Sequence, residues 1–524
     1  MLNLIPQPLR AESTKGLVWF SKKTTFSGAF SGIYPVLRPM LPLCEEAQEN
    51  TLLFQKDSSL PEEGYRLHCE NGDLFVEASD QRGAFYAVMT LLQLCGEGAT
   101  FESVSIEDAP RYHHRGFMLD CARHFWSVKK IKQILDIMAR LKMNVFHWHL
   151  TEDQGWRIEI KKYPLLTEKG AIRKSTALSL TGYEEHKEPR DYTEYGRGLF
   201  YTQEEVRDVV AYAKARQIDI LPEIDMPGHF VAAIACYPHL SCTGEPTEVS
   251  DRWGVLDNIG CCGKEDIYNF VKDIIDELCE LFPYPYFHIG GDEVPKTRWK
   301  QCPACQAKIK ELGLKDENAL QGHFNNVITA YLREKGRSTV GWNEILEASD
   351  TLDPTIIPQW WTPMEGSHRE LDWLAAGNHL IISLIDYVYM APAYAIRPLA
   401  KTYSFGPDKL GITDDTNVLG VEAPQWTEYI RDEEKLDINT FPRLSAIAEV
   451  AWTQPENKDY DSFEQRLENL RGYYAKLGVK LPPAWLYRGD SIAPVDEKDR
   501  IEKGWAVWKN DPYFEIKMLH EKEG

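Results

Sequence analysis

The spacing of apolar residues changes character near residue 110. Before it, residues 64–69 and 73–78 alternate apolar and polar positions between Gly, Asn and Asp residues, a pattern typical of half-buried β-strands. Residues 81–94 follow, with apolar positions at helical spacing. We therefore predict a small α+β domain over residues 1–109.

From residue 110 onward, short apolar runs alternate with longer helical stretches. The clearest helix spans residues 127–141, with Ser127 as a good N-cap. Eight alternating units predict a (β/α)8 TIM barrel over residues 110–455. Residues 456–524 contain one clear helix, 460–477, and are expected to form a helical extension packed on the barrel. The eight predicted strands are residues 116–120, 144–149, 218–224, 286–289, 339–342, 356–361, 379–383 and 418–422.

Composition and charge narrow the range of partners. Hydrophobic residues make up 43% and charged residues 27% of the chain, as in ordinary globular proteins. A net charge of −21 argues against nucleic acid and anionic membranes, which select basic surfaces. Fifteen Trp and 25 Tyr suit sugar binding, because the apolar face of a pyranose stacks on aromatic rings. We expect no cofactor.

The first residues and the cysteines bear on the compartment. The chain begins without a basic region followed by an apolar core, so we expect a cytoplasmic protein unless a leader has been trimmed. Eleven Cys, an odd number, do not form a secreted disulfide framework. Cys302 and Cys305 have chelating spacing, with Cys261 and Cys262 upstream. One CxxC without a clear second half is a weak zinc signal, so reduced thiols are favoured over a structural metal.

Two adjacent carboxylates, Asp292 and Glu293, end the predicted strand at residues 286–289 after two glycines. Glycines allow a sharp turn or a close approach to a ligand. Like charges this close push one pKa upward, so one carboxyl group can stay protonated near neutral pH. A solvated acidic turn is the alternative, and the other strand ends argue against it.

Every predicted barrel strand is followed by a polar or aromatic side chain, and barrel enzymes build their sites at these ends. Acids, His and Arg can grip hydroxyl groups, while indoles can enclose a sugar ring. Packing of the core alone does not readily explain polar or aromatic residues at all eight strand ends, and the set predicts a sugar pocket. The residues are Arg123, Glu152, Asp153, Asp225, His229, Asp292, Glu293, Trp342, Trp361, Tyr387, Trp426 and Glu428.

These motifs resemble those of family 20 glycoside hydrolases, the β-N-acetylhexosaminidases, and follow the family's order. The small N-terminal domain also fits that architecture. The resemblance implies exo-acting, retaining hydrolysis of terminal β-linked GlcNAc, and by extension GalNAc, from a small oligosaccharide or glycoconjugate. The matching segments are residues 120–125, 147–157, 223–229, 288–294, 341–344 and 426–428.

The family mechanism implied by this resemblance explains why two acids can be neighbours. An ordinary retaining glycosidase needs its two carboxyl groups about 5 to 5.5 Å apart across the sugar. Family 20 enzymes instead use the 2-acetamido oxygen of the substrate to attack C1, which gives an oxazolinium-type intermediate. By position, Glu293 resembles the general acid/base. Asp292 resembles the residue that holds the acetamido N–H and stabilises the growing positive charge.

The remaining correspondences place aromatic residues around the sugar. Trp342, Trp361 and Trp426 resemble the walls of the pocket. Trp361 is preferred to Trp360 by motif spacing, since neighbouring strand residues point in opposite directions. Tyr387 resembles the tyrosine that bonds the acetamido oxygen and aims it at C1.

Four charged residues complete the resemblance. Arg123 and Glu428 resemble the pair that grips hydroxyls far from the scissile bond, while His229 and Glu152 resemble a relay that positions and tunes Glu293. Glu152 stands where many members carry Asp. Tyr389 stands where several carry Asp or Asn against the upper hydroxyls, which leaves the choice between GlcNAc and GalNAc open.

Other interpretations remain at this stage. His147 and His149 point the same way from one strand and, with Asp292, could form the metal site of an amidohydrolase. A family 18 chitinase would need acids spaced two apart on one strand, and a non-catalytic sugar-binding barrel would have little use for both acids. The aglycone and a possible homodimer are not determined.

Overall fold

The computed structural model describes residues 2–96, 98–178, 190–363, 368–394, 396–479 and 481–488. A six-stranded mixed sheet and a closed eight-stranded barrel dominate these residues. No helix in this part of the chain is both long and apolar enough to cross a membrane.

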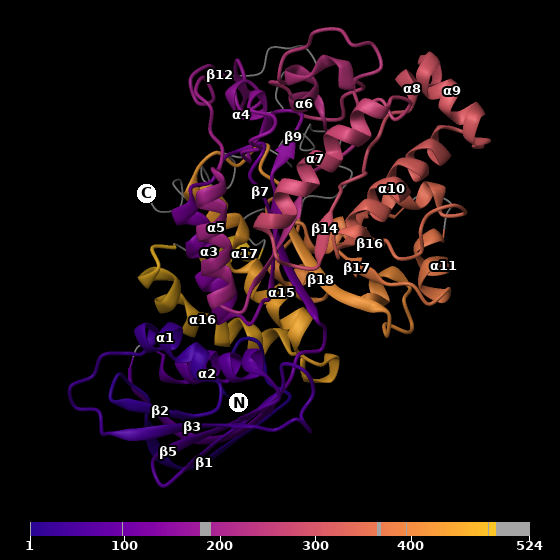
Figure 1. The fold of residues 1–524 in the computed structure, drawn as a ribbon. Helices are drawn as coiled ribbons and strands as arrows, with labels where there is room; N and C mark the ends of the chain where they lie inside the picture. Colours follow the sequence, from indigo (N-terminus) through magenta and orange to yellow (C-terminus); the bar gives the residue numbers. More distant parts are fainter. Residues whose placement is uncertain are drawn as a thin grey trace.

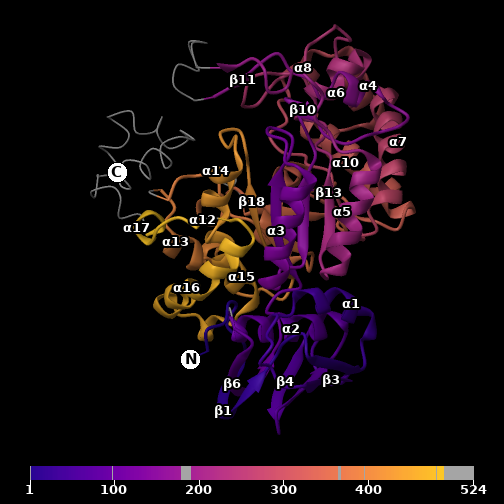
Figure 2. The ribbon, with the colours of Figure 1, turned by 90° about the vertical axis from the view of Figure 1, so that its left-hand side faces the viewer.

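The N-terminal sheet has the strand order β1-β6-β4-β5-β3-β2. Its helix α2 (Gln81–Cys95) begins at Asp80, whose side chain accepts a hydrogen bond from the Gly83 amide. Figure 1 shows α2 lying between this sheet and the rest of the molecule, and Figure 2 shows the same arrangement from the side. The strands are β1 (Arg10–Trp19), β2 (Thr24–Gly28), β3 (Asn50–Lys56), β4 (Tyr65–Glu70), β5 (Asp73–Ala78) and β6 (Thr100–Asp108).

The barrel consists of eight parallel strands that close on themselves, which confirms the predicted fold class. Each predicted strand corresponds to one observed strand, because buried parallel strands read as short apolar runs. The barrel strands are β7 (His114–Asp120), β8 (Val145–His149), β13 (Asp219–Glu223), β14 (Tyr286–His288), β15 (Ser338–Trp342), β16 (Ile357–Trp360), β17 (Leu380–Ile382) and β18 (Val418–Gln425).

Helices surround the barrel and continue into the C-terminal part of the chain (Figure 1). The predicted helix near 127–141 is α3, and Ser127 caps it by accepting a hydrogen bond from the Lys130 amide. The longer helices are α3 (Val128–Arg140), α5 (Gln203–Ala215), α7 (Glu265–Leu281), α9 (Pro303–Leu312), α10 (Glu317–Glu334), α14 (Glu433–Thr440), α15 (Arg443–Trp452) and α16 (Tyr460–Lys476).

Shorter elements lie mostly in the loops. Those after β8 include β9 (Thr151–Glu152) and β10 (Gly155–Trp156), which pair with each other. The other helices are α1 (Tyr34–Leu37), α4 (Leu165–Glu168), α6 (Val231–Cys236), α8 (Thr297–Gln301), α11 (Arg369–Ala375), α12 (Ile385–Val388), α13 (Leu399–Tyr403) and α17 (Ala484–Tyr487), and the remaining strands are β11 (Thr176–Ala177) and β12 (Arg190–Asp191).

Buried polar contacts join the N-terminal sheet to the barrel. Asp108, at the end of β6, accepts hydrogen bonds from Lys142 at 2.7 Å and from the Trp452 indole at 2.8 Å. Gln93 on α2 donates to the carbonyl of Arg140, the last residue of α3, at 2.9 Å. The two parts therefore pack through satisfied polar groups as well as apolar ones. The division at residues 109 and 455 stays a prediction.

Helix α16 is attached to α15 by a buried ion pair. The Arg466 guanidinium donates to Glu449 at 2.6 and 2.8 Å, and neither side chain is more than 3% exposed. Arg466 also donates to the carbonyl of Leu4, and Tyr403 donates to Glu449. The pair thus joins the start of the chain, the last barrel helix and the C-terminal helix.

Replacing Arg466 with Met should lower the free energy of unfolding by about 3 to 5 kcal/mol, because it leaves the buried Glu449 charge without its partner. Arg471→Met is the matched control on the same helix. Its pair with Glu468 is 2.9 Å long but exposed, so its loss should cost under about 1 kcal/mol. Denaturant unfolding measures both, and equal losses would contradict the role given to the buried pair.

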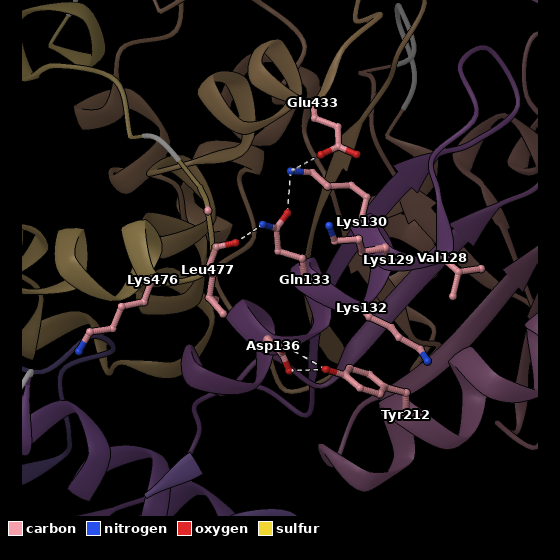
Figure 3. A pocket seen from close by; sticks show the side chains of 11 residues that line it. Val128, Lys129, Lys130, Lys132, Gln133, Asp136, Tyr212, Glu433, Lys476 and Leu477 are labelled. Atoms are coloured by element: carbon pink, nitrogen blue, oxygen red, sulfur yellow. Dashed lines mark hydrogen bonds and ion pairs between the residues drawn. The ribbon is translucent and has the colours of Figure 1, made fainter. Parts of the chain in front are cut away.

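A surface hollow of about 690 Å³ lies on the outer side of the barrel between α3, α5 and the end of α16 (Figure 3). Its polar groups bond to one another: Lys130 donates to Gln133 at 2.8 Å, Gln133 to the Leu477 carbonyl, and Tyr212 to Asp136. These contacts make it a junction between helices. The predicted site residues lie elsewhere, around the strand ends.

Candidate active site

A glycine turn positions the two adjacent carboxylates. Strand β14 ends at His288, and Gly290 and Gly291 then adopt φ values of +66° and +94°. A Cβ atom at Gly290 would lie 1.8 Å from the Asp225 carboxylate, and the Gly291 amide donates to that carboxylate at 3.2 Å. Only glycine allows the chain to turn this close to Asp225, so the turn determines where Asp292 begins.

Asp292 and Glu293 lie in different environments although they are neighbours. The Asp292 side chain is 10% exposed and that of Glu293 is 38% exposed. Burial, aided by the Glu293 charge and opposed by His229, raises the pKa of Asp292 to about 6. The sequence predicted a raised pKa in this pair, and the structure assigns it to Asp292. Different environments are what give two carboxyl groups different roles.

His229 connects this pair to the next strand ends. Its Nε2 atom lies 3.4 Å from Glu293 and 3.9 Å from Asp292, while Nδ1 lies 2.9 Å from Glu152. Burial opposes a charge on His229, but the Glu152 charge and hydrogen bond raise its pKa well above the usual value. These contacts favour the charged form of the imidazole, which links the predicted relay residue Glu152 to Glu293.

Arg123 extends the same chain of contacts. Its guanidinium lies 2.5 Å from Glu152 and 4.8 Å above the Trp426 ring. Despite burial, Arg123 and His229 lower the pKa of Glu152. The sequence paired Arg123 with Glu428. In the structure burial raises the pKa of Glu428, and the Arg123 charge opposes that rise. The direct ion pairs of Arg123 are with Glu152 and, at 3.5 Å, with Asp120.

Aromatic rings lie beside these charged groups. The Trp342 and Trp426 rings are 5.7 Å apart, and Tyr389 lies 6.4 Å from Trp426 and 6.0 Å from Trp361, stacked on it. Trp361 donates to Glu344 at 2.7 Å. Trp360 points into the core, where it is 6% exposed, so the structure places Trp361 and not its neighbour beside the other rings.

Trp342 lies at the base of the group. It is fully buried, and its indole N–H donates to Glu223 at 2.8 Å. This contact fixes the orientation of the ring, because Glu223 is itself held by His149 and His288.

The structure does not bring Tyr387 to the other site residues. Its ring lies against Phe405 at 5.5 Å, and the Lys401 ammonium lies 5.3 Å from it. Tyr389 lies among the aromatic rings instead, and the charges of Asp292 and Glu293 contribute to the rise in its pKa, after the larger effect of burial. The structure therefore corrects the prediction that Tyr387 lies at the site. Tyr387 lies in the short helix α12, whose residues do not follow strand alternation.

Other buried acids were present in the motifs but received no role. Burial and the Asp292 charge raise the pKa of Glu344 to about 8, and burial raises that of Asp153 to about 7. Glu223 and Glu422 lie inside the barrel and hold His147 between them. Glu223 and Glu422 could have been found in the sequence as acids within apolar strands. Burying a charge there is costly unless the charge is paired.

The metal-site alternative required His147, His149 and Asp292 to converge. His147 and His149 both bind Glu223, and Asp292 lies beside His229. The two histidines thus belong to a buried ion-pair layer beneath the site, and the ligand set of that alternative does not form.

Acids of different exposure, a histidine paired with them and several aromatic rings lie together at the carboxyl ends of the barrel strands. A site of this kind on a (β/α)8 barrel defines a glycoside hydrolase. The chain belongs to glycosyl hydrolase family 20: the model of that family's catalytic domain matches residues 112–455, and its domain 2 matches residues 39–109.

Individual relatives agree with the family model. A β-hexosaminidase of Porphyromonas gingivalis is 38% identical over 89% of this chain and 62% of its own length. The crystal structure of a β-N-acetylhexosaminidase from Bacteroides fragilis superposes with a TM-score of 0.79 at 32% identity, covering 94% of this chain and 99% of that one. A Vibrio harveyi exo-β-N-acetylglucosaminidase, solved with N-acetylglucosamine, gives a TM-score of 0.79 at 32% identity. The match covers 92% of this chain and 78% of that one. The chain thus spans less than two thirds of the Porphyromonas relative.

Proposed function

We propose that the chain is an exo-acting, retaining β-N-acetylhexosaminidase that releases terminal β-linked GlcNAc with the help of the substrate's own acetamido group. The observation that carries the proposal is the arrangement of Asp292 and Glu293 about His229, with oxygen and nitrogen atoms all within 4.8 Å of one another. A conventional retaining pair faces across the sugar instead.

Each carboxylate suits one step of this mechanism. Glu293 is the more exposed and can reach a leaving-group oxygen, to which it gives its proton; it then takes a proton from the attacking water. Asp292 is buried and, as an anion, can bind the acetamido N–H and stabilise the oxazolinium charge. His229 and Glu152 position Glu293, while Trp342, Trp361 and Trp426 enclose the ring. Arg123 and Glu428 are assigned to the hydroxyls far from the scissile bond.

The test compares p-nitrophenyl β-N-acetylglucosaminide with the p-nitrophenyl β-glucoside that lacks the acetamido group. We expect turnover of the first and a loss of at least about two orders of magnitude in kcat/KM for the second, because the nucleophile is missing. Comparable cleavage of both would rule out substrate assistance. We extend the proposal to GalNAc, which the matching galactosaminide tests in the same assay.

Tyr389 takes the role that the sequence gave to Tyr387. Tyr389→Phe should lower kcat/KM about 10- to 100-fold, since a hydrogen bond to a group that becomes charged is worth about 1.5 to 3 kcal/mol. Tyr387→Phe is the matched control and should stay within about twofold of the wild type, because its ring lies against Phe405 and Lys401. The reverse order of effects would restore the sequence-based assignment.

The natural substrate is a small oligosaccharide or glycoconjugate that ends in N-acetylhexosamine, and its aglycone is not specified by the residues above. A cytoplasmic location and a homodimer stay predictions. Cell fractionation and sedimentation of the full chain would check them.

A further inference from the structure

Four cysteine sulfurs lie together outside the proposed catalytic site. They belong to Cys242, Cys261, Cys302 and Cys305, and all four lie within 4.8 Å of one another. Three of these residues are buried and Cys242 is half-buried. The sequence indicated only the last two, with Cys261 upstream, and Cys242 supplies the missing fourth position.

The separations between the sulfurs match those in a tetrahedral metal site. Cys261 lies 3.7 Å from Cys302 and 3.6 Å from Cys305, and Cys242 lies 4.0 Å from Cys305. A zinc ion with Zn–S bonds of about 2.3 Å holds its four sulfurs about 3.8 Å apart. A disulfide needs about 2.05 Å between sulfurs, and all four cysteines are free.

The backbone around the cluster suits thiolate ligands. Cys302 is the N-cap of α9 and Cys305 lies in its first turn, where the helix dipole favours negative charge. The Gly263 amide donates to the Cys261 sulfur. A Cβ atom at Gly263 would lie 2.3 Å from the backbone of Ala304 and Cys305, so a glycine is needed for the two loops to approach this closely.

We propose that Cys242, Cys261, Cys302 and Cys305 bind one structural zinc ion. The cysteines would bind as thiolates and release their protons to solvent. Tetrahedral coordination by four sulfurs favours zinc over magnesium or calcium, which prefer oxygen ligands. The four cysteines come from two separate segments of the chain, residues 236–262 and 292–305.

The four-cysteine cluster lies next to the segments that lead to the proposed catalytic residues. The Gly260 amide, next to Cys261, donates to the Pro227 carbonyl at 2.8 Å, and Pro227 is two residues before His229. The Trp299 indole donates to the Gly260 carbonyl at 2.9 Å. An ion here would hold together the segments that carry His229 and Glu293, without contacting either residue.

The experiment measures metal in the full chain, purified under reducing conditions and exchanged into buffer with a mild chelator. Elemental analysis should find about one zinc per wild-type chain. Cys242→Ser and Cys305→Ser should each lose most of it and unfold at a lower temperature. Cys262→Ala is the matched control: it is buried next to Cys261 but outside the four-sulfur group, and should keep its zinc.

A second measurement does not depend on the variants folding. Wild-type protein, stripped of metal and titrated with Co²⁺, should show the absorption of tetrahedral thiolate-bound cobalt, and zinc should abolish it. Wild type without zinc and without this spectrum would overturn the proposal, as would iron in place of zinc or a disulfide between any two of the four cysteines. No glycoside is used, so the result is independent of the proposed hydrolase activity.

Discussion

Glu293→Gln should lower kcat/KM for hydrolysis of chitobiose, whose leaving group is a sugar hydroxyl, by about two to four orders of magnitude, the usual contribution of a general acid. The carboxyl side chain of Glu293 is partly exposed and lies 3.4 Å from His229. Glutamine keeps the shape of the side chain and its contact with His229 but has no proton to give to the leaving group.

The size of the loss should depend on the leaving group. A glycoside of an acidic phenol leaves without protonation, so Glu293→Gln should lose much less activity on it than on chitobiose. Glu347→Gln is the matched control, since Glu347 lies 3.8 Å from Lys296 and has no place among the predicted site residues. Equal losses on both substrates would show that Glu293 acts through the structure and not as an acid.

Asp292→Asn is expected to cost about two to three orders of magnitude in kcat, the scale of one preorganised electrostatic contact in the transition state. Asn can still accept the acetamido N–H but carries no charge to stabilise the oxazolinium group. A stable cationic analogue of that intermediate should accordingly bind the variant more weakly, while binding of GlcNAc itself changes little. Similar losses for both ligands would contradict the electrostatic role.

The same residue predicts the acidic limb of the pH profile. Burial and Glu293 raise the pKa of Asp292 to about 6. Asp292 is an anion above this pH and neutral below it, so kcat/KM of the wild type should be lost as the pH falls through about 6. The limb should be absent from the residual activity of Asp292→Asn. An unchanged limb in that variant would assign it to another group.

The local pattern of the chain determined the barrel strands, the helices and the position of the acid pair. Buried parallel strands and amphipathic helices leave regular signals. The two glycines before Asp292 and Glu293 mark a turn that the sequence indicates, because residues 290 and 291 adopt positive φ, whereas their close approach to Asp225 is set by the tertiary structure. The predicted N-cap at Ser127 is also a local feature, because its side chain accepts a hydrogen bond from the Lys130 amide.

Contacts between distant loops could not be derived in this way. Tyr389 reaches the site because the Met390 amide donates to the Pro424 carbonyl of β18 at 2.9 Å, while Tyr387 turns away on α12. The ion pair of Arg123 with Glu152 has a similar origin, since it joins loops after two different strands.

Burial and long-range encounters were decided only by the tertiary structure. The separate environments of Asp292 and Glu293 follow from how deeply each side chain lies, which adjacency in sequence does not specify. Cys242 meets Cys305, which lies 63 positions further along the chain, so no local spacing could complete the four-sulfur cluster. Hydrophobic periodicity determines which elements form and which face is buried, whereas side chains in loops are placed by the packing of the whole chain.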